Sequence, residues 1–282
     1  MKKKYEEIIL SKTLYIVSTP IGNLEDISYR AVKILKNVNI IAVENIKHTS
    51  ILLKNYNIKN KIIKISKEKK IFKKLKTGNS VAIVSNAGTP LINDPGYSLV
   101  KYCKKNNIKI IPIPGACAAI SALISSGIKT NKFCYEGFLP KSKSKKNKTL
   151  KKLKYETRTI ILYESPKRII KTLEDITKKI GKKRQLVIAR EITKKWESII
   201  GSSSENMLKL IKKNKLYQKG EIVIVIEGNR NKKNKKLTTQ IIESISVLKD
   251  FVGNKKAIKI ISKIFKIQKK ILYKYNIKNE KK

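Results

Sequence analysis

The sequence has few of the residues on which metal and redox chemistry depend. Its 282 residues include three cysteines, Cys103, Cys117 and Cys134, and a single histidine, His48. The cysteines lie far apart and form no CxxC pair, which argues against a disulfide framework and against a cysteine zinc site. One histidine also excludes every mechanism that needs two, such as that of the HExxH metalloproteases. We therefore expect a protein without a metal.

Long apolar runs are absent as well. The longest, about residues 110–124, is interrupted by Pro112, Pro114 and Gly115 and is shorter than the ~20 residues of a transmembrane helix. The N-terminus begins with lysines, but two glutamates stand where a signal peptide has its apolar segment. The sequence therefore predicts a soluble, cytoplasmic protein with no membrane partner.

Acidic residues are scarce: 66 Lys and Arg against 20 Asp and Glu give a formal net charge of +46. Only six of the basic residues are Arg, whose bidentate fork is well suited to reading phosphates. A genome rich in A and T, whose codons favour Lys, Ile and Asn, explains much of this excess. The field still attracts polyanions and repels cations, whatever its origin.

Short apolar runs alternate with helical patterns in the first half of the chain. Strands separated by single helices are typical of βαβ units and a mainly parallel sheet. Asp94 and Pro95 are expected to begin one helix, as its N-cap and first residue. The predicted strands are residues 14–18, 40–43, 61–65, 81–85 and 108–113, with helices near 27–36, 49–56, 67–76 and 96–105.

The second half predicts another α/β unit. It is preceded by a basic low-complexity stretch, residues 139–148, which we expect to be a flexible loop. Beyond residue 237, apolar residues at helical spacing predict two or three short amphipathic helices. The elements expected between these segments are strands near 159–163, 185–190 and 221–227, a helix at 165–181 and a charged linker at 228–236.

Three turns rich in glycine, proline and small residues follow predicted strands, at residues 19–24, 85–96 and 112–119. In an open α/β sheet, ligands bind outside the carboxyl ends of the strands. Neither GxGxxG nor GxxxxGK[ST] is present, which argues against dinucleotide and P-loop sites. Each turn taken alone is also compatible with ordinary turn geometry or with close helix packing.

The order of these segments along the chain is more specific than any one of them. They read TPIGNLED, SNAGTPLINDPG, PGACAAI, YEGFLPKSKSKK, YESPKR and AREITK. With them the chain resembles the ribosomal RNA small subunit methyltransferase I family of the tetrapyrrole methylase superfamily. The resemblance runs from about Leu14 to Gly228 and continues weakly through the C-terminal tail.

The resemblance implies a fold and an activity. The fold is α/β, with an N-terminal domain (12–128), a second domain (129–228) that completes a cleft for S-adenosylmethionine, and a small basic helical module (237–282), in a homodimer. The activity is methylation of the ribose 2′-hydroxyl of a decoding-centre cytidine, cytidine 1402, in 16S rRNA of the small ribosomal subunit. Two alternatives remain open: methylation of a tetrapyrrole, and a non-catalytic protein that binds RNA or assists ribosome assembly.

The resemblance also implies site residues, carried over position by position. The chain departs from the family pattern at Asn45, Ile46 and Lys47, where the family usually has Asp, Thr and Arg, and at Asn86, where it has Asp. The positions expected to bind the cofactor are Pro20, Gly22, Ala87, Gly88, Thr89, Asp94, Ala118 and Ala119, followed in the second domain by Tyr163, Ala189 and Gly228.

Ribose methylation needs a group that withdraws a proton from the 2′-hydroxyl or polarises its oxygen. Glu44 and His48 are the candidates, with Lys47 as a nearby cation. The alternative is that Glu44 and His48 only fix their loop, with a glutamate at a strand end acting instead: Glu136, Glu164 or Glu191. The basic segment supplies the expected RNA contacts, Lys141, Lys143, Lys145 and Lys146.

Overall fold

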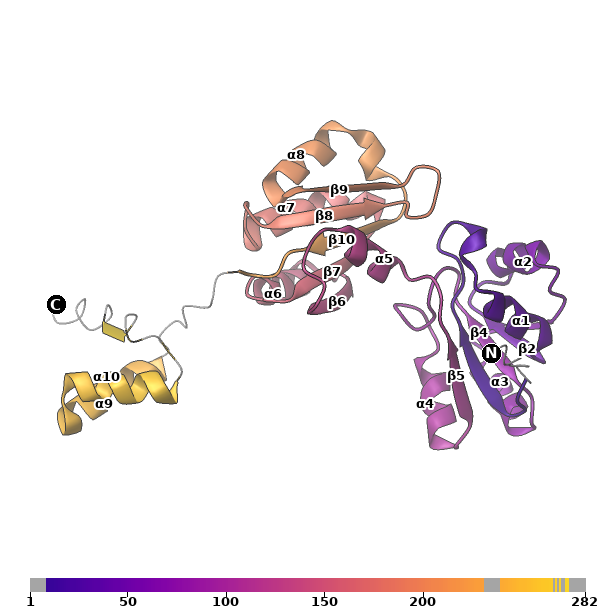
Figure 1. The fold of residues 1–282 in the computed structure, drawn as a ribbon, viewed down its shortest axis with the longest axis horizontal. Helices are drawn as coiled ribbons and strands as arrows, with labels where there is room; N and C mark the ends of the chain where they lie inside the picture. The colour runs from indigo at the N-terminus through magenta and orange to yellow at the C-terminus, as the bar shows by residue number, and fades with distance from the viewer. Residues whose placement is uncertain (1–8, 231–238, 266, 268, 270–271, 274–282) are drawn as a thin grey trace, which may run out of the picture. The chain divides into compact units, whose positions relative to one another are not determined.

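The structure is a computed structural model, and it describes residues 9–230, 239–265, 267, 269 and 272–273. The chain divides into two compact units, residues 1–228 and 229–282. The first unit holds two five-stranded sheets, and the second holds the C-terminal helices (Figure 1). Within the described residues, no helix has both the length and the apolar character needed to cross a membrane.

The first sheet is entirely parallel and has the strand order β3-β2-β4-β1-β5. Its inner strands β2 and β4 are buried throughout because helices cover both faces. The sequence predicted all five strands to within one residue at each end. Their bounds are β1 Thr13–Val17, β2 Ile40–Val43, β3 Lys61–Lys64, β4 Val81–Val84 and β5 Lys109–Ile113.

Alternate residues of these strands pack against different helices. Tyr15 and Val17 face a core with α1 and α2, whereas Leu14 faces a core with α3 and α4. This alternation follows from the two-residue period of a strand. The helices are α1 Tyr29–Asn37, α2 Ile46–Asn55, α3 Glu68–Lys76 and α4 Tyr97–Lys105, with a 3₁₀ turn, η1, at Leu24–Asp26.

Two of the predicted helix starts are wrong. Helix α2 begins three residues earlier than expected, because the Asn45 side chain caps it by accepting from the backbone N–H of His48. Helix α4 begins after Gly96, whose φ of 126° is accessible to glycine, so Asp94 and Pro95 precede the helix rather than start it. The Asp94 carboxyl is thereby left available for another role.

The second sheet is mixed, with strand order β6-β7-β10-β8-β9, and only β6 and β7 run parallel. Sequence patterns found β7, β8 and β10 but missed both edge strands. Strand β6 carries a bulge between Tyr135 and Gly137, which breaks its alternation, and β9 is rich in serine. The bounds are β6 Phe133–Phe138, β7 Thr159–Glu164, β8 Gln185–Arg190, β9 Ser198–Ser203 and β10 Ile222–Ile226.

Helices cover both faces of the second sheet. Helices α6, α7 and α8 bury one face, and α5 packs through Ala119, Ala122 and Leu123 on the other. The predicted domain ranges stay a proposal, and the packing of α5 argues for a first boundary before Ala118. The helices are α5 Ala118–Ser125, α6 Lys143–Leu153, α7 Ile169–Lys179 and α8 Ser204–Lys213, with 3₁₀ turns η2 Pro166–Arg168 and η3 Lys215–Gln218.

The C-terminal unit contains helices α9, Thr239–Val252, and α10, Asn254–Ile264. Gly253, with a φ of 73°, joins them. The two helices were predicted by the helical spacing. Buried residues of these helices and of the segment after them form one core: Ile241, Ile245, Ile258, Ile261, Ile267 and Leu272. Residues 237–238, 266, 268, 270–271 and 274–282 of the predicted module lie outside the described residues.

Only the first part of the basic segment, residues 139–142, is a loop. Residues 143–148 form the first turns of α6, which contradicts the predicted flexible loop over this range. Lys146 is only 7% exposed, and its Nζ lies 2.8 Å from Asp175 Oδ2 and 3.2 Å from Thr172 Oγ1. Its ammonium is therefore engaged inside the fold, so the predicted RNA contact at Lys146 is wrong.

We predict that Lys146→Ala lowers the free energy of unfolding by about 2–3 kcal/mol, because it leaves Asp175 unpaired and removes a packed aliphatic stem. The neighbouring Lys145→Ala is the control, since Lys145 is exposed, and it is expected to change stability by less than about 0.5 kcal/mol. Urea unfolding followed by circular dichroism measures both. Equal stability of the two variants would contradict the buried pairing.

Candidate active site

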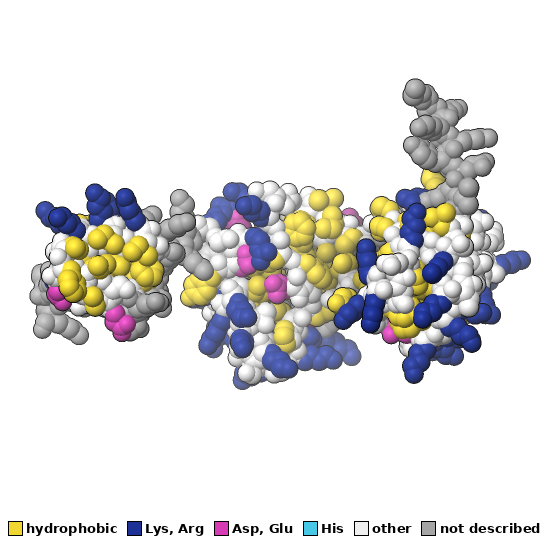
Figure 2. All heavy atoms as spheres, turned by 90° about the horizontal axis from the view of Figure 1, so that it is seen from below, with side chains coloured by type: hydrophobic (Ala, Val, Ile, Leu, Met, Phe, Trp, Pro, Cys, Tyr) yellow, Lys and Arg dark blue, Asp and Glu magenta, His cyan; other side chains and the backbone are white. Residues whose placement is uncertain are grey.

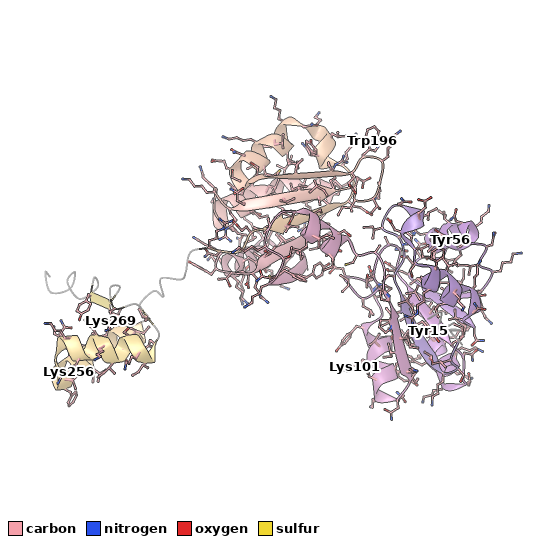
Figure 3. The ribbon with its side chains drawn as sticks, in the orientation of Figure 1. Tyr15, Tyr56, Lys101, Trp196, Lys256 and Lys269 are labelled. Atoms are coloured by element: carbon pink, nitrogen blue, oxygen red, sulfur yellow. The ribbon has the colours of Figure 1, made fainter. Side chains whose placement is uncertain are left out.

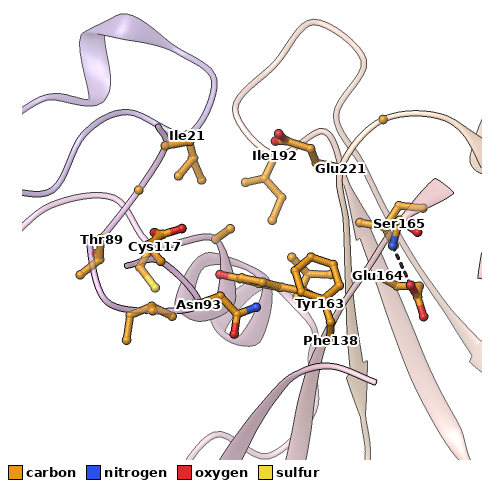
Figure 4. A pocket seen from close by; sticks show the side chains of 18 of the residues that line it. Ile21, Thr89, Asn93, Cys117, Phe138, Tyr163, Glu164, Ser165, Ile192 and Glu221 are labelled. Atoms are coloured by element: carbon orange, nitrogen blue, oxygen red, sulfur yellow. Dashed lines mark hydrogen bonds between the residues drawn. The ribbon is translucent and has the colours of Figure 1, made fainter. Parts of the chain in front are cut away.

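A cavity of about 380 Å³, called the first cavity, lies where strands of both sheets end (Figure 4). From the first sheet, the segments after β4 and β5 line it. From the second sheet, the carboxyl ends of β6 and β7 and the amino end of antiparallel β10 line it. The residues are Ile21, Ala87–Thr89, Ile92–Asp94, Cys117, Ala118, Phe138, Tyr163–Pro166, Ile192 and Gly220–Val223.

Backbone hydrogen bonds tie the turns after β1 and β4 together at this cavity. Thr19 N–H donates to Gly88 O at 2.9 Å, and Gly88 N–H donates to Thr19 O at 3.0 Å. Gly88 has a φ of 77°, a left-handed conformation that favours glycine. The Thr89 hydroxyl donates to Ala116 O at 3.0 Å and lies 3.1 Å from Ser18 Oγ, which adds the turn after β5. The three turns thus form one rigid wall.

The wall facing these turns is largely apolar. Phe138 and Tyr163 stack edge to face, with their ring centroids 5.8 Å apart. Ile192 also lines the cavity from the second sheet, and the turns of the first sheet add the side chain of Ile21 and the carboxyl of Asp94. An apolar site with a few placed polar groups is the usual composition of a small-molecule pocket.

Burial raises the pKa of Asp94 to about 6, with the negative charge of Glu44 as the second cause and the Ser85 hydroxyl opposing both. The Asp94 carboxyl therefore changes charge near neutral pH. Perturbed carboxyls in clefts are common at functional sites, which makes Asp94 a candidate ligand contact.

Glu164, by contrast, is fully engaged. Its buried carboxylate accepts from Ser165 N–H at 2.8 Å (Figure 4) and from Thr172 Oγ1 at 2.6 Å. Arg168 Nε lies 3.4 Å from the same carboxylate and its Nη2 donates to Leu139 O at 2.7 Å. Glu164 therefore holds the end of β7 in place, which argues against it as a proton acceptor.

A second cavity of about 350 Å³ lies on the other side of the turn after β1. Among the described residues, Thr49 Oγ1 and Asn86 Oδ1 find no hydrogen-bond partner although both atoms are buried. Both residues line this cavity, which therefore offers polar atoms to a ligand. The lining residues are Thr19–Gly22, Leu24, His48, Thr49, Ile51, Leu52, Ser85–Ala87, Lys194 and Glu221.

The turn after β1 meets the loop between β8 and β9 at the second cavity. Asn23 N–H donates to Thr193 Oγ1 at 3.1 Å. A Cβ on Gly22 would lie 2.5 Å from Lys194 Cγ and 2.7 Å from Thr193 Oγ1, so only glycine allows this approach. Lys194 Nζ also pairs with Glu191 Oε1 at 3.1 Å and with Glu221 Oε2 at 3.0 Å.

The structure brings together most of the residues that the resemblance assigned to the cofactor. Ala87, Gly88, Thr89, Asp94, Ala118 and Tyr163 line the first cavity. Pro20 and Gly22 line the second cavity instead. Ala119 and Ala189 line neither and are buried in the core between α5 and the second sheet. Their roles in cofactor binding stay predictions.

Gly228 lies apart from the first cavity. It follows the carboxyl end of β10, beside the start of antiparallel β7, whereas the first cavity lies at the other end of both strands. A Cβ at this position would lie 2.0 Å from Thr157 O, so the glycine permits close backbone packing. This packing accounts for the glycine without a ligand, and a cofactor contact at Gly228 stays a prediction.

The predicted catalytic residues lie at the start of α2. Glu44, Lys47 and His48 are all exposed, and of the three only His48 lines one of the two cavities, the second. Of the alternative glutamates, Glu191 is paired with Lys194. Burial raises the pKa of Glu191, but a hydrogen bond from the Glu221 backbone and the ammonium of Lys194 together hold it below its ordinary value. Of Glu44, Lys47 and His48, His48 is thus the candidate that reaches a cavity.

Several lining residues were missed by sequence reasoning. Gly220 and Glu221 reach the cavities from the turn before β10, and nothing in their local sequence distinguishes them from ordinary turn residues. Cys117, Phe138 and Ile192 lie inside the recognised segments PGACAAI, YEGFLPKSKSKK and AREITK, so membership of those segments is the signal that finds them.

Similarity to solved structures defines the class of fold. Uroporphyrin-III-C-methyltransferase from Thermus thermophilus matches with a TM-score of 0.56 and 14% identity, over 77% of this chain and 94% of that chain. A cobalt precorrin-4 methyltransferase matches with a TM-score of 0.57 and 15% identity, over 77% and 95%. The fold is therefore that of the tetrapyrrole methylases.

Sequence similarity narrows this class. The family described as Tetrapyrrole (Corrin/Porphyrin) Methylases matches residues 13–208. Ribosomal RNA small subunit methyltransferase I of Buchnera aphidicola subsp. Schizaphis graminum is 54% identical over 282 residues, covering 97% of this chain and 99% of the relative. That of Escherichia coli O157:H7 is 40% identical over 273 residues, covering 95% of each. The chain belongs to the ribosomal RNA small subunit methyltransferase I family, as the ordered motifs predicted.

The raised pKa of Asp94 predicts a pH-dependent stability. Between the ordinary value of 3.8 and the folded value of about 6, the folded chain binds the proton more tightly than the unfolded chain. Stability from this group therefore falls as the pH rises through this window. Asp94→Asn has no titrating carboxyl at this position, so its free energy of unfolding should match the parent's near pH 4. Above pH 6.5 it should exceed the parent's by about 1–2 kcal/mol, a difference that solvent screening reduces because Asp94 is half-exposed.

Urea unfolding of parent and variant between pH 4 and 8 measures this difference, in which the titration of all other groups cancels. A constant difference across the whole range would mean that the Asp94 carboxyl titrates at its ordinary pH.

Proposed function

We propose that the protein transfers a methyl group from S-adenosylmethionine to the ribose 2′-hydroxyl of a cytidine, cytidine 1402, in 16S rRNA of the small ribosomal subunit. The observation that carries the proposal is the match of nearly the whole chain to relatives named for methylation of this RNA. We further propose that it acts in the cytoplasm, where small subunits are available.

The first cavity is the proposed cofactor site. Its volume of about 380 Å³ lies within the range of ~300–1,000 Å³ for small-molecule sites. The open backbone at Gly88, the aromatic wall with Tyr163 and the Asp94 carboxyl suit a ligand that combines a flat ring, a ribose and an ammonium group. When bound, S-adenosylmethionine supplies a methyl group already activated on a sulfonium, so the residues around it have only to position it.

The second cavity is the proposed site for the acceptor nucleotide. Ile21, Ala87 and Glu221 line both cavities, so a ribose in the second lies close to a ligand in the first. His48 lines the second cavity and is the proposed acceptor for the 2′-hydroxyl proton, while Glu44 and Lys47 are proposed to tune the charge around it. The family's Asp is Asn at position 45, which still caps α2, so this departure preserves the local geometry.

The basic surface is proposed to hold the RNA. Lysine and arginine side chains spread over the face seen in Figure 2, with few acidic ones between them. Lys141, Lys143 and Lys145 are exposed at the start of α6 and remain proposed phosphate contacts. We also propose a homodimer, because Ile120 and Ile124 leave an exposed apolar strip on α5, 43% and 71% exposed; analytical ultracentrifugation tests it.

The function is tested by incubating the protein with unmodified small subunits and methyl-labelled S-adenosylmethionine, followed by mapping of the label. We expect one labelled cytidine, with the label on ribose. His48→Ala should lower the turnover rate by about 10²-fold or more while leaving cofactor affinity unchanged. Binding of subunits without methyl transfer would favour the non-catalytic alternative, and transfer to a tetrapyrrole instead of RNA would favour the other.

The cofactor site has its own test in a matched pair of glycines. Gly88→Ala forces a left-handed φ on alanine and brings its Cβ within 3.1 Å of Ile21 Cγ2, at the cavity wall. Gly78→Ala forces the same φ region where nothing lies within 4 Å. Titration calorimetry should give about tenfold or greater loss of cofactor affinity for Gly88→Ala and none for Gly78→Ala. Equal affinities would place the cofactor elsewhere.

A further inference from the structure

The loop between β8 and β9 exposes the sole tryptophan of the sequence. Trp196 is 61% exposed, although tryptophan is among the residues that gain most from burial. Figure 3 shows it on this loop, beyond the ends of the two strands. A tryptophan that keeps more than half of its surface exposed in the fold of its own chain has an apolar ring available to a partner.

The loop is held rigidly by a buried arginine. Arg190, 4% exposed, donates from Nη2 to Trp196 O at 2.8 Å, from Nη1 to Lys219 O at 3.4 Å and from Nε to Ser198 Oγ at 3.3 Å. Thr193 N–H also donates to Glu197 Oε2 at 2.6 Å. The backbone that carries the indole is therefore fixed before any partner arrives, which lowers the entropy lost on binding.

The surroundings of Trp196 suit an anionic partner with flat rings. Lys195 Nζ lies 5.3 Å from the centroid of the indole. Lys194, two residues away, lines the second cavity, where Thr49 Oγ1 and Asn86 Oδ1 lack hydrogen-bond partners among the described residues. An aromatic platform next to cations and a polar cavity is the arrangement by which proteins bind unpaired nucleotides.

We propose that Trp196 stacks on an unpaired base of the RNA that flanks the nucleotide in the second cavity. This inference rests on the proposed function and adds the form of RNA that the site accepts. Bases of a duplex are stacked on each other and do not expose a face to the indole, so the site selects a single-stranded segment. Lys195, exposed beside the indole, contacts a phosphate next to the stacked base, whereas the ammonium of Lys194 is held by Glu191 and Glu221.

The indole itself reports on the proposal, because the chain has no other tryptophan. Titration of the full chain with a short single-stranded, cytidine-containing RNA should quench its fluorescence, whereas the same RNA in a duplex should not. Absence of quenching by the single strand overturns the stacking proposal, whether or not small subunits are methylated.

Three variants separate stacking from a structural effect. Trp196→Ala should weaken binding of unmodified small subunits by about five- to a hundredfold, and Trp196→Phe should retain most of the affinity, because phenylalanine still stacks. Tyr155→Ala is the matched control: Tyr155 is 49% exposed with Lys154 Nζ 5.9 Å from its ring, but no residue of its turn lines either cavity, whereas Ile192 and Lys194 of the Trp196 loop do. Cofactor affinity should be the same for all three.

Filter binding with small subunits, together with sedimentation of the free protein, distinguishes the outcomes. Parent-like affinity of Trp196→Ala overturns the proposal while methylation by the parent leaves the proposed function standing. Conversion of a dimer to a monomer by Trp196→Ala, with unchanged RNA affinity, also overturns it and assigns the indole to a protein interface. Quenching by single-stranded RNA without subunit methylation would support stacking and reject the proposed function.

Discussion

The reciprocal hydrogen bonds between Thr19 and Gly88 are the constraint on which both cavities depend. They join the turns after β1 and β4, which are adjacent strands of the first sheet. One side of the joined turns lines the first cavity through Gly88, and the other side lines the second cavity through Pro20 and Gly22. The left-handed φ of Gly88 is what allows both bonds to form. The proposed cofactor site and the proposed acceptor site thus lie on the two sides of the same pair of joined turns.

Much of the fold follows from local patterns, because buried parallel strands and amphipathic helices leave clear periodicities. The strands of the first sheet were predictable for this reason, and the edge strands of the second were not, since the bulge between Tyr135 and Gly137 interrupts one and the serine content hides the other. The same limit applies to Lys146: its sequence context is a run of lysines, and only the packing of α6 on α7 reveals its partner, Asp175.

The candidate site was predictable on the side of the first sheet and much less so on the side of the second. Segments such as Ala87–Thr89 carry turn chemistry that is visible in the sequence. Contacts such as that of Gly22 with Thr193 join residues about 170 positions apart, and no local pattern encodes them. Gly228 shows the converse case, since the close approach of the Thr157 backbone already accounts for a glycine that matches a motif position.

In this lysine-rich chain, three of the arginines hold segments of the fold together rather than only adding charge to the surface. Arg168 bonds Leu139 O and Glu164, Arg184 bonds the carbonyls of Glu227 and Lys154, and Arg190 bonds two carbonyls and a hydroxyl. Each uses the planar fork to reach several acceptors at once, which a lysine ammonium does less well. Replacement of arginine by lysine is therefore unfavourable where one side chain must bond two or three segments. The exposed lysines face no such constraint, so their number reflects composition, and their proposed contribution to RNA binding comes from their positive charge.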